Sequence, residues 1–172
     1  MEIYDYTSKA TNSTDPSIFL AGPTPRDYQT MLECEWRTNA IGILNKLEFD
    51  GKVFVPGVID KCGHVKGMID LPYEEIIEWE LTHLEKAQCI AFWIPRKPNQ
   101  GMPGFTTNVE FGMYVKSGKC ILGYPEDAKH MDYLNYVAKL NNVFISNSLL
   151  GTMSKATILA NTYKSIWRPY HG

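Results

Sequence analysis

Short apolar runs separated by longer amphipathic segments dominate the pattern of hydrophobic and polar positions along the chain. The runs are too short for buried helices, and Gly, Pro or charged residues end most of them. Runs without polar positions are typical of strands that are covered on both faces of a sheet. The pattern therefore predicts five buried strands, at residues 17–21, 53–55, 89–94, 120–122 and 143–145.

The segments between these strands show apolar residues near the helical period, which predicts an alternation of strands and helices. Such an alternation is typical of a doubly wound α/β fold with a parallel sheet. We expect a flavodoxin-like five-stranded sheet in the order 2-1-3-4-5 with helices on both faces. The expected helices cover residues 28–47, 72–86, the segment around Glu110, 128–140 and 149–166.

Length and composition indicate one globular domain over residues 16–172, preceded by a flexible arm over residues 1–15. Hydrophobic residues make up 44% of the chain and charged residues 21%, and the net charge of −2 indicates no basic surface for a nucleic acid polymer. No apolar stretch reaches the length of a membrane helix, and the polar N-terminus does not resemble a secretory signal. We expect a cytoplasmic protein.

The cysteines and histidines show no spacing typical of a metal site or a disulfide framework. Cys34, Cys62, Cys89 and Cys120 contain no Cys-x-x-Cys pair, which favours reduced thiols. Cys62 and His64 form a weak pair that is more typical of loop structure than of a zinc site. We therefore expect neither a metal nor an organic cofactor.

Glu110 is the leading catalytic candidate, because the strand order places its helix beside the crevice at the carboxyl ends of the strands. The turn at residues 22–26 and the loop that begins near Arg96 would converge on the same crevice. A second interpretation remains open, since Thr107 and Glu110 have the spacing of a helix capping box. In both interpretations Glu110 would stand in the first turn of its helix, and in the second it would only satisfy the N-cap backbone N–H.

Glu80 is a second candidate, on the helix expected over residues 72–86. It follows Ile76 by four residues, so it flanks the apolar stripe and can project towards the edge of the sheet. An acid in the solvated face of an amphipathic helix is the alternative interpretation.

Blocks of sequence that follow one another in order resemble the nucleoside 2-deoxyribosyltransferase-like superfamily. The resemblance extends from about residue 17 to residue 125. It rests on residues 17–26 (SIFLAGPTPR), 36–37, 53–56, 78–80 (EWE), 92–96 (FWIPR), 106–112 (TTNVEFG) and 117–119. It implies a flavodoxin-like fold and cleavage of the N-glycosidic bond of a nucleoside or nucleotide.

The resemblance also implies roles for individual residues. Glu110 matches the family's nucleophilic glutamate, and Glu80 matches a second acid that is usually Asp. Many relatives carry Tyr on the first strand where this chain has Phe19, so a helpful hydroxyl would come from Tyr73 or Tyr28, or be absent.

Such chemistry suits two carboxylates, since one can attack C1′ while the other protonates the departing base. The expected substrate-binding residues come from the strand ends and from the helix that contains Glu110. Asn108 and the backbone near Thr107 would bind sugar hydroxyls, or Asn108 would face solvent as the first residue of its helix. Phe19 and Trp93 would stack on the base or belong to the core. The full set is Phe19, Gly22, Pro23, Arg26, Trp93, Arg96, Thr107 and Asn108, of which Arg26 and Arg96 would bind a 5′-phosphate or pair with surface acids.

Three functions remain open on the sequence alone. The first is transfer of a 2-deoxyribosyl group between bases, the second is hydrolysis of a nucleoside 5′-monophosphate, and the third is nucleotide binding without catalysis. Family members commonly form dimers or larger homo-oligomers in which a neighbour completes the site. The aromatic residues that offer material for such an interface are Tyr133, Tyr136, Tyr163, Trp167 and Tyr170.

Overall fold

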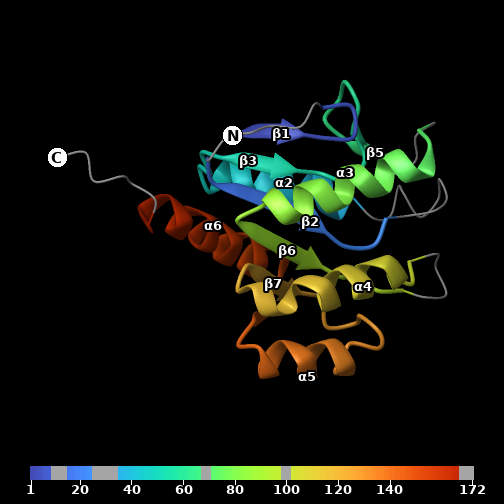
Figure 1. Cartoon of the computed structure of the whole chain (residues 1–172), viewed down its shortest axis with the longest axis vertical. Coiled ribbons are helices and arrows are strands. Elements are labelled where there is room, and N and C mark those ends of the chain that lie inside the picture. The colour runs from blue at the N-terminus through green and yellow to red at the C-terminus, as the bar shows by residue number, and fades with distance from the viewer. Residues whose placement is uncertain (9–14, 25–34, 67–70, 98–101, 167–172) are drawn as a thin grey trace.

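A parallel sheet organises the computed structural model of the chain, which describes residues 1–8, 15–24, 35–66, 71–97 and 102–166. The strands lie in the order β1-β3-β2-β6-β7-β8, and each neighbouring pair is parallel (Figure 1). They are β1 (Glu2–Tyr4), β2 (Ser17–Ala21), β3 (Lys52–Phe54), β6 (Cys89–Trp93), β7 (Cys120–Gly123) and β8 (Phe144–Ser146).

The predicted strand order is confirmed, because β3-β2-β6-β7-β8 is the order 2-1-3-4-5 of the five predicted strands. The strand β1 is an addition at the edge. It pairs with β3 in parallel, with Glu2 opposite Lys52 and Tyr4 opposite Phe54. The prediction of a flexible arm is therefore wrong for residues 2–4, since the backbone groups on the open edge of β3 bind this segment.

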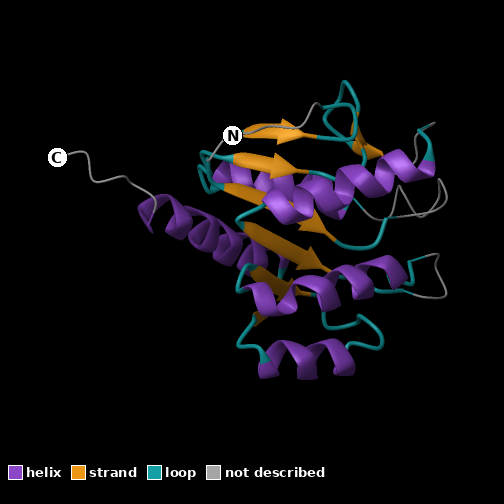
Figure 2. Ribbon diagram, viewed as in Figure 1, coloured by secondary structure: helices purple, strands orange, loops and turns teal. Residues whose placement is uncertain are grey.

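Helices cover both faces of the sheet, as predicted (Figure 2). One face packs against α2 (Trp36–Lys46) and α6 (Leu149–Ile166). The opposite face packs against α3 (Tyr73–Lys86), α4 (Phe105–Tyr114) with the 3₁₀ turn η2 (Val115–Ser117), and α5 (Asp132–Leu140).

The two faces explain why the central strands are apolar at every position. In β2 the side chains of Ile18 and Leu20 enter the core beneath α2 and α6. The alternate residues Phe19 and Ala21 enter the core beneath α3 and α4. All four are at most 1% exposed, so no position of β2 beyond Ser17 faces water.

Most predicted helix boundaries agree with the structure. The helices α3, α5 and α6 lie within the ranges 72–86, 128–140 and 149–166. In the described residues α2 begins at Trp36, and residues 28–34 of the helix predicted over residues 28–47 lie outside the described part of the chain.

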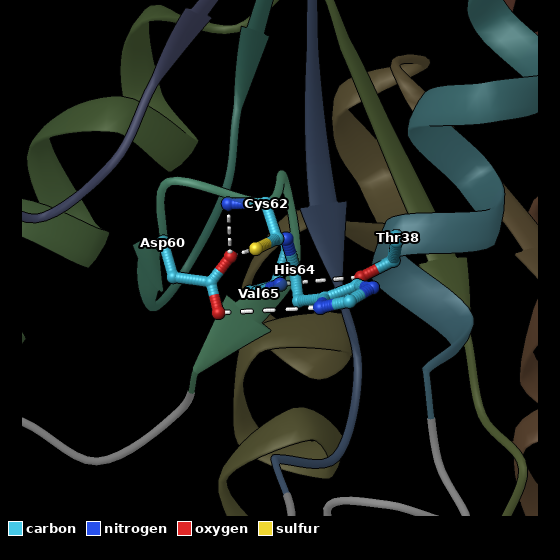
Figure 3. Close-up of polar contacts among 5 residues, drawn as sticks. All are labelled: Thr38, Asp60, Cys62, His64 and Val65. Carbon is cyan, nitrogen blue, oxygen red and sulfur yellow. Dashed lines mark hydrogen bonds and ion pairs between the residues drawn. The ribbon is translucent and has the colours of Figure 1, made fainter.

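The segment predicted as a loop between residues 57 and 71 contains a small hairpin of β4 (Val58–Ile59) and β5 (Val65–Lys66). The Asp60 side chain accepts hydrogen bonds from the backbone N–H groups of Cys62 and His64, at 2.9 and 3.0 Å (Figure 3). The Val65 N–H donates to the Thr38 hydroxyl of α2 at 3.2 Å. Cys62 and His64 therefore belong to a loop structure, as expected.

Other expectations concern thiols, metals and membranes. Cys89 and Cys120 are buried and free, Cys62 is exposed and free, and Cys34 lies outside the described residues. Within the described ranges, no cluster of three or more His, Cys, Asp or Glu side chains has a metal-binding arrangement. No described helix combines the length and hydropathy needed to cross a membrane.

Candidate active site

A pocket of about 470 Å³ opens at the carboxyl end of β2, between α3 and the start of α4. This is the predicted switch point, since β2 lies between β3 and β6 and its connections leave in opposite directions. Backbone and side chains from four segments line it: Tyr6, Gly22, Pro23, Thr24, Tyr73, Ile76, Ile77, Glu80, Pro103, Gly104, Phe105, Thr106, Thr107 and Glu110.

Both candidate carboxylates line this pocket, although they come from different helices. Glu80 shares the pocket-facing side of α3 with Tyr73, Ile76 and Ile77, which precede it by seven, four and three residues. This spacing makes Glu80 part of one helical face that is directed at the pocket. The expectation that Glu80 is only a solvated surface acid is therefore wrong.

The capping-box interpretation of Glu110 is wrong. The helix α4 begins at Phe105, after Gly104 with a left-handed φ of 66°, so Thr107 is the third helical residue and not the N-cap. Glu110 is then the sixth residue and stands in the second turn, not the first. The helix can begin at Phe105, before Thr107, because Gly104 at the N-cap adopts a positive φ without a steric cost. Glu110 is thus free of a capping role.

Burial raises the pKa of both carboxyls, and the charge of Glu80 adds to the effect on Glu110. Burial, followed by the negative charge of Glu80, raises the pKa of Glu110 from 4.5 to about 7, while the charge of Arg37 opposes this shift. Burial also raises the pKa of Glu80, against the lowering effects of a hydrogen bond from Tyr6 and of Arg37. Glu110 consequently exchanges its proton near neutral pH, where general acid and base groups are most effective, and Glu80 keeps its proton to a higher pH than an exposed glutamate does.

Arg37 fixes the turn that forms one wall of the pocket. Its guanidinium is 5% exposed and donates to the backbone carbonyls of Leu20, Gly22 and Pro23, at 3.3, 2.8 and 3.4 Å. The indole N–H of Trp36 also donates to the Pro23 carbonyl, at 3.2 Å. Sequence reasoning noted these two residues only as part of the family resemblance and missed their role as supports of the pocket.

Gly22 allows the same turn to approach β6 closely. A Cβ atom at this position would lie 2.1 Å from the Trp93 carbonyl oxygen and 2.8 Å from Cζ2 of Trp36. No side chain fits there without moving backbone. The prediction that Gly22 and Pro23 belong to the site agrees with their position on the pocket wall.

Replacing Arg37 by Met is expected to cost about 2–4 kcal/mol of folding stability, because the carbonyls of Leu20 and Gly22 lose the donor that Arg37 supplies and the carbonyl of Pro23 keeps only the Trp36 indole. The loss of its positive charge should also raise the pKa of Glu110 above about 7. Urea unfolding and a carboxyl titration followed by NMR measure the two effects.

Arg37→Lys is the matched control, because lysine keeps the charge but not the forked set of donors. Arg37→Lys should lose folding stability, while the pKa of Glu110 should change less than in Arg37→Met. An unchanged pKa of Glu110 in Arg37→Met would contradict the electrostatic role of Arg37.

Tyr6 is a pocket residue that sequence reasoning missed. Its hydroxyl donates to Oε1 of Glu80 at 2.6 Å, and its ring packs edge-on against Trp79. Tyr73 was expected to supply a hydroxyl, and it lines the pocket with 68% of its surface exposed. Tyr28, the other expected source, lies outside the described residues. Tyr6 fell in the predicted flexible arm, so no local signal identified it.

The aromatic residues of the strands belong to the core. Phe19 is fully buried on the face covered by α3 and α4, and Trp93 is 7% exposed on the face covered by α2 and α6. Neither is among the described residues that line the pocket, which favours the alternative that both belong to the core. Among the described residues, the aromatic rings that line the pocket are those of Tyr6, Tyr73 and Phe105.

Arg96 and Asn108 contact each other beside the pocket. The Arg96 guanidinium is 4% exposed and donates to the side-chain oxygen of Asn108 and, at 2.9 Å, to the backbone carbonyl of His130. These contacts tie the start of α4 to the loop before α5. The expected roles of Arg96 in phosphate binding and of Asn108 in sugar binding find no support in this arrangement. Arg26 lies outside the described residues.

Comparison with protein families gives a match over residues 15–128, which is more than half of the chain. The matching family is described as nucleoside 2-deoxyribosyltransferase like. The match includes both pocket carboxylates, Arg37 and the Gly22 turn, whereas Tyr6 precedes it. Comparison with curated proteins gives no match.

Proposed function

Because the chain belongs to the nucleoside 2-deoxyribosyltransferase-like family, we propose that it transfers the sugar of a 2-deoxynucleoside from one nucleobase to another. The observation that carries this proposal is the convergence of Glu80 and Glu110, from two helices, on one pocket at the carboxyl end of β2. A pocket for binding alone gains nothing from two acids whose charges repel each other.

In the proposed reaction the Glu110 carboxylate attacks C1′ of the sugar as the bond between C1′ and the base nitrogen breaks. The electron pair of that bond moves to the base, which takes a proton from Glu80. The product of this step is a sugar ester on Glu110 and a free base. A second base then attacks C1′ as the ester bond between C1′ and Glu110 breaks, which restores the Glu110 carboxylate. The incoming base gives its own N–H proton to Glu80, and the new nucleoside leaves.

This reaction needs Glu110 ionised and Glu80 protonated. In the empty pocket the Tyr6 hydroxyl and Arg37 both favour a charged Glu80, whereas only Arg37 favours a charged Glu110. A base nitrogen or carbonyl oxygen next to Glu80 accepts a hydrogen bond from its protonated form only. Substrate binding therefore moves the shared proton to Glu80 and leaves Glu110 charged.

The remaining lining of the pocket suits an uncharged nucleoside. Tyr73 and Phe105, at the first turns of α3 and α4, offer rings on which a base can stack. The hydroxyls of Thr24 and Thr106 offer partners for the sugar. None of the described lining residues is Lys, Arg or His.

Chromatography of two mixtures tests this function. One tube contains the protein, thymidine and adenine, and the other contains thymidine monophosphate in place of thymidine. We expect deoxyadenosine in the first tube. Thymine released only from the monophosphate would replace the proposal by a nucleotide hydrolase, and no reaction with a wide panel of nucleosides would favour a binding domain.

We also propose that two copies associate through α3 and α4. Residues at spacings of four lie on one side of a helix, and here they form two exposed apolar stripes. The stripes extend to the pocket rim, since Tyr73, Ile77 and Phe105 belong to both, so a second copy would cover the mouth of the pocket. They consist of Tyr73, Ile77 and Leu81 on α3 and of Phe105, Val109 and Met113 on α4.

Val109→Lys is expected to weaken this association at least about tenfold, because a charged side chain would be buried against apolar surface. Sedimentation velocity over a concentration series measures the effect. Leu140→Lys, at an exposed apolar position of α5, is the control and should leave the association unchanged. Equal weakening in both variants, or a wild-type chain that is monomeric throughout the series, would contradict this interface.

A further inference from the structure

The N-terminal residues are bound to the body of the protein beyond the pairing of β1. The backbone N–H of Tyr6 donates to the Gly57 carbonyl at 3.0 Å. The Asp5 carboxylate, 8% exposed, accepts from the Ile59 N–H at 3.0 Å and from the backbone and hydroxyl of Thr7 at 3.0 and 2.7 Å. It also accepts from the Ser8 hydroxyl at 3.1 Å. These contacts fix the turn that carries Tyr6.

The side chain of Tyr6 reaches from this turn to the acid pair. Its ring centroid lies 5.0 Å from that of Trp79, with the two planes at 85°. Its hydroxyl donates to Glu80 Oε1 at 2.6 Å, a short distance typical of a hydrogen bond to a carboxylate. Tyr6 therefore lines the pocket and contacts Glu80 directly.

We propose that Tyr6 is a positioning residue that holds the Glu80 carboxyl group in place for proton transfer. Through Tyr6 the N-terminal segment contributes a side chain to the site. The inference rests on the proposed function. With Oε1 occupied by the Tyr6 hydroxyl, the proton of Glu80 is carried by Oε2, which remains available to the departing base. The donor of the proton is thus one defined oxygen of the carboxyl group.

Tyr6 also favours the step itself. As the proton leaves Oε2 for the base nitrogen, negative charge develops on the Glu80 carboxylate, and hydrogen bonds to charged groups are stronger than those to neutral ones. The hydrogen bond from Tyr6 consequently strengthens in the transition state. This strengthening increases the rate, because only an interaction that is stronger in the transition state than in the ground state lowers the barrier.

Tyr6 lies before residues 15–128, over which the chain matches its family. The aromatic residue of β2, Phe19, is fully buried and has no hydroxyl. A hydroxyl from a separate segment therefore reaches the acid pair, and it contacts Glu80.

Tyr6→Phe tests this role, because the ring contacts are kept and only the hydroxyl is lost. We expect kcat for base exchange to fall about ten- to hundredfold with KM nearly unchanged. The charged and titratable groups that act on Glu80 are Tyr6, Arg37 and Glu110. Without the hydrogen bond from Tyr6, Glu80 should keep its proton to higher pH, so the basic limb of the kcat profile should move upward.

Tyr4→Phe is the matched control, since its hydroxyl donates to exposed Glu2 and lies in the same segment away from the pocket. Its kcat and pH profile should equal those of the wild type. Thermal unfolding shows whether both variants are folded. If they are, and Tyr6→Phe keeps the wild-type kcat and the wild-type basic limb of the pH profile, this inference is overturned while the proposed function stands. The same loss in both variants would overturn it too, because the hydroxyl of Tyr6 would then not be special. A wild type inactive on every nucleoside would overturn the proposed function and this inference together.

Discussion

Replacing Glu110 by Gln is expected to lower kcat for base exchange by at least about a thousandfold. Glutamine has nearly the same size and keeps one oxygen acceptor, but its amide does not form a sugar ester. Because the pocket shape is kept, nucleoside binding should change by less than about tenfold. The experiment compares turnover by chromatography with the affinity for thymidine measured by calorimetry.

Glu78→Gln is the control for this variant, because Glu78 lies two residues before Glu80 on the exposed side of α3 and is not among the described pocket residues. It should retain wild-type turnover. Activity of Glu110→Gln within tenfold of the wild type would mean that another group forms the bond to C1′. A loss of thymidine binding equal to the loss of turnover would instead indicate a damaged pocket.

The same substitution is expected to change how stability depends on pH. The pKa of Glu110 in the folded chain is about 7, above its ordinary value of 4.5, so between these values the folded state binds more protons than the unfolded state. The contribution of Glu110 to stability is therefore fully present below about pH 4.5 and is lost as the pH rises through about 7. The size of this effect is at most about 3 kcal/mol.

Glu110→Gln removes this penalty, because glutamine is never charged. We expect the variant to be more stable than the wild type by about 2–3 kcal/mol at pH near 8 and nearly equal at pH near 4. Urea unfolding at both pH values measures the difference. If the difference in stability between the wild type and the variant is the same at both pH values, Glu110 is not buried beside a second charge.

A gain of stability in Glu110→Gln would mean that the proposed catalytic group lowers the folding stability, as strained or charged sites often do. Glu80 adds to this cost, since burial raises its pKa as well. Arg37 limits the cost for both carboxyls, which explains why a buried cation is useful behind the Gly22 turn.

The strand order and the meeting of Glu80 with Glu110 could be predicted from the sequence, because both follow from the order of buried strands. Once β2 and β6 are neighbours, the loops after them and the helices α3 and α4 share one end of the sheet. The pattern of apolar runs is strong enough to place these elements.

The helix start at Gly104 could not be predicted from spacing, because Thr107 and Glu110 match a capping box equally well. Only the backbone conformation of Gly104 decides between the two. The contact between Tyr6 and Glu80 joins residues 74 positions apart, and such a contact leaves no local pattern. The strand β1 was missed for a related reason, since its three residues include only one apolar aliphatic side chain.

The positions of Phe19 and Trp93 show a second limit on predicting site residues from the sequence. Strand alternation places them on opposite faces of the sheet, under α3 and α4 in one case and under α2 and α6 in the other. A residue inside a strand that is covered on both faces belongs to the core, and substrates meet the residues that follow the strand. Here those residues are Gly22, Pro23 and Thr24.

Mass spectrometry of the intact protein mixed with thymidine, in the absence of an acceptor base and after quenching in acid, tests the central claim most directly. We predict an added mass of one deoxyribosyl group, which peptide analysis places on Glu110 and which Glu110→Gln lacks. An adduct on another residue, or thymine release that continues unchanged in Glu110→Gln, would contradict a covalent mechanism at this pair of carboxylates.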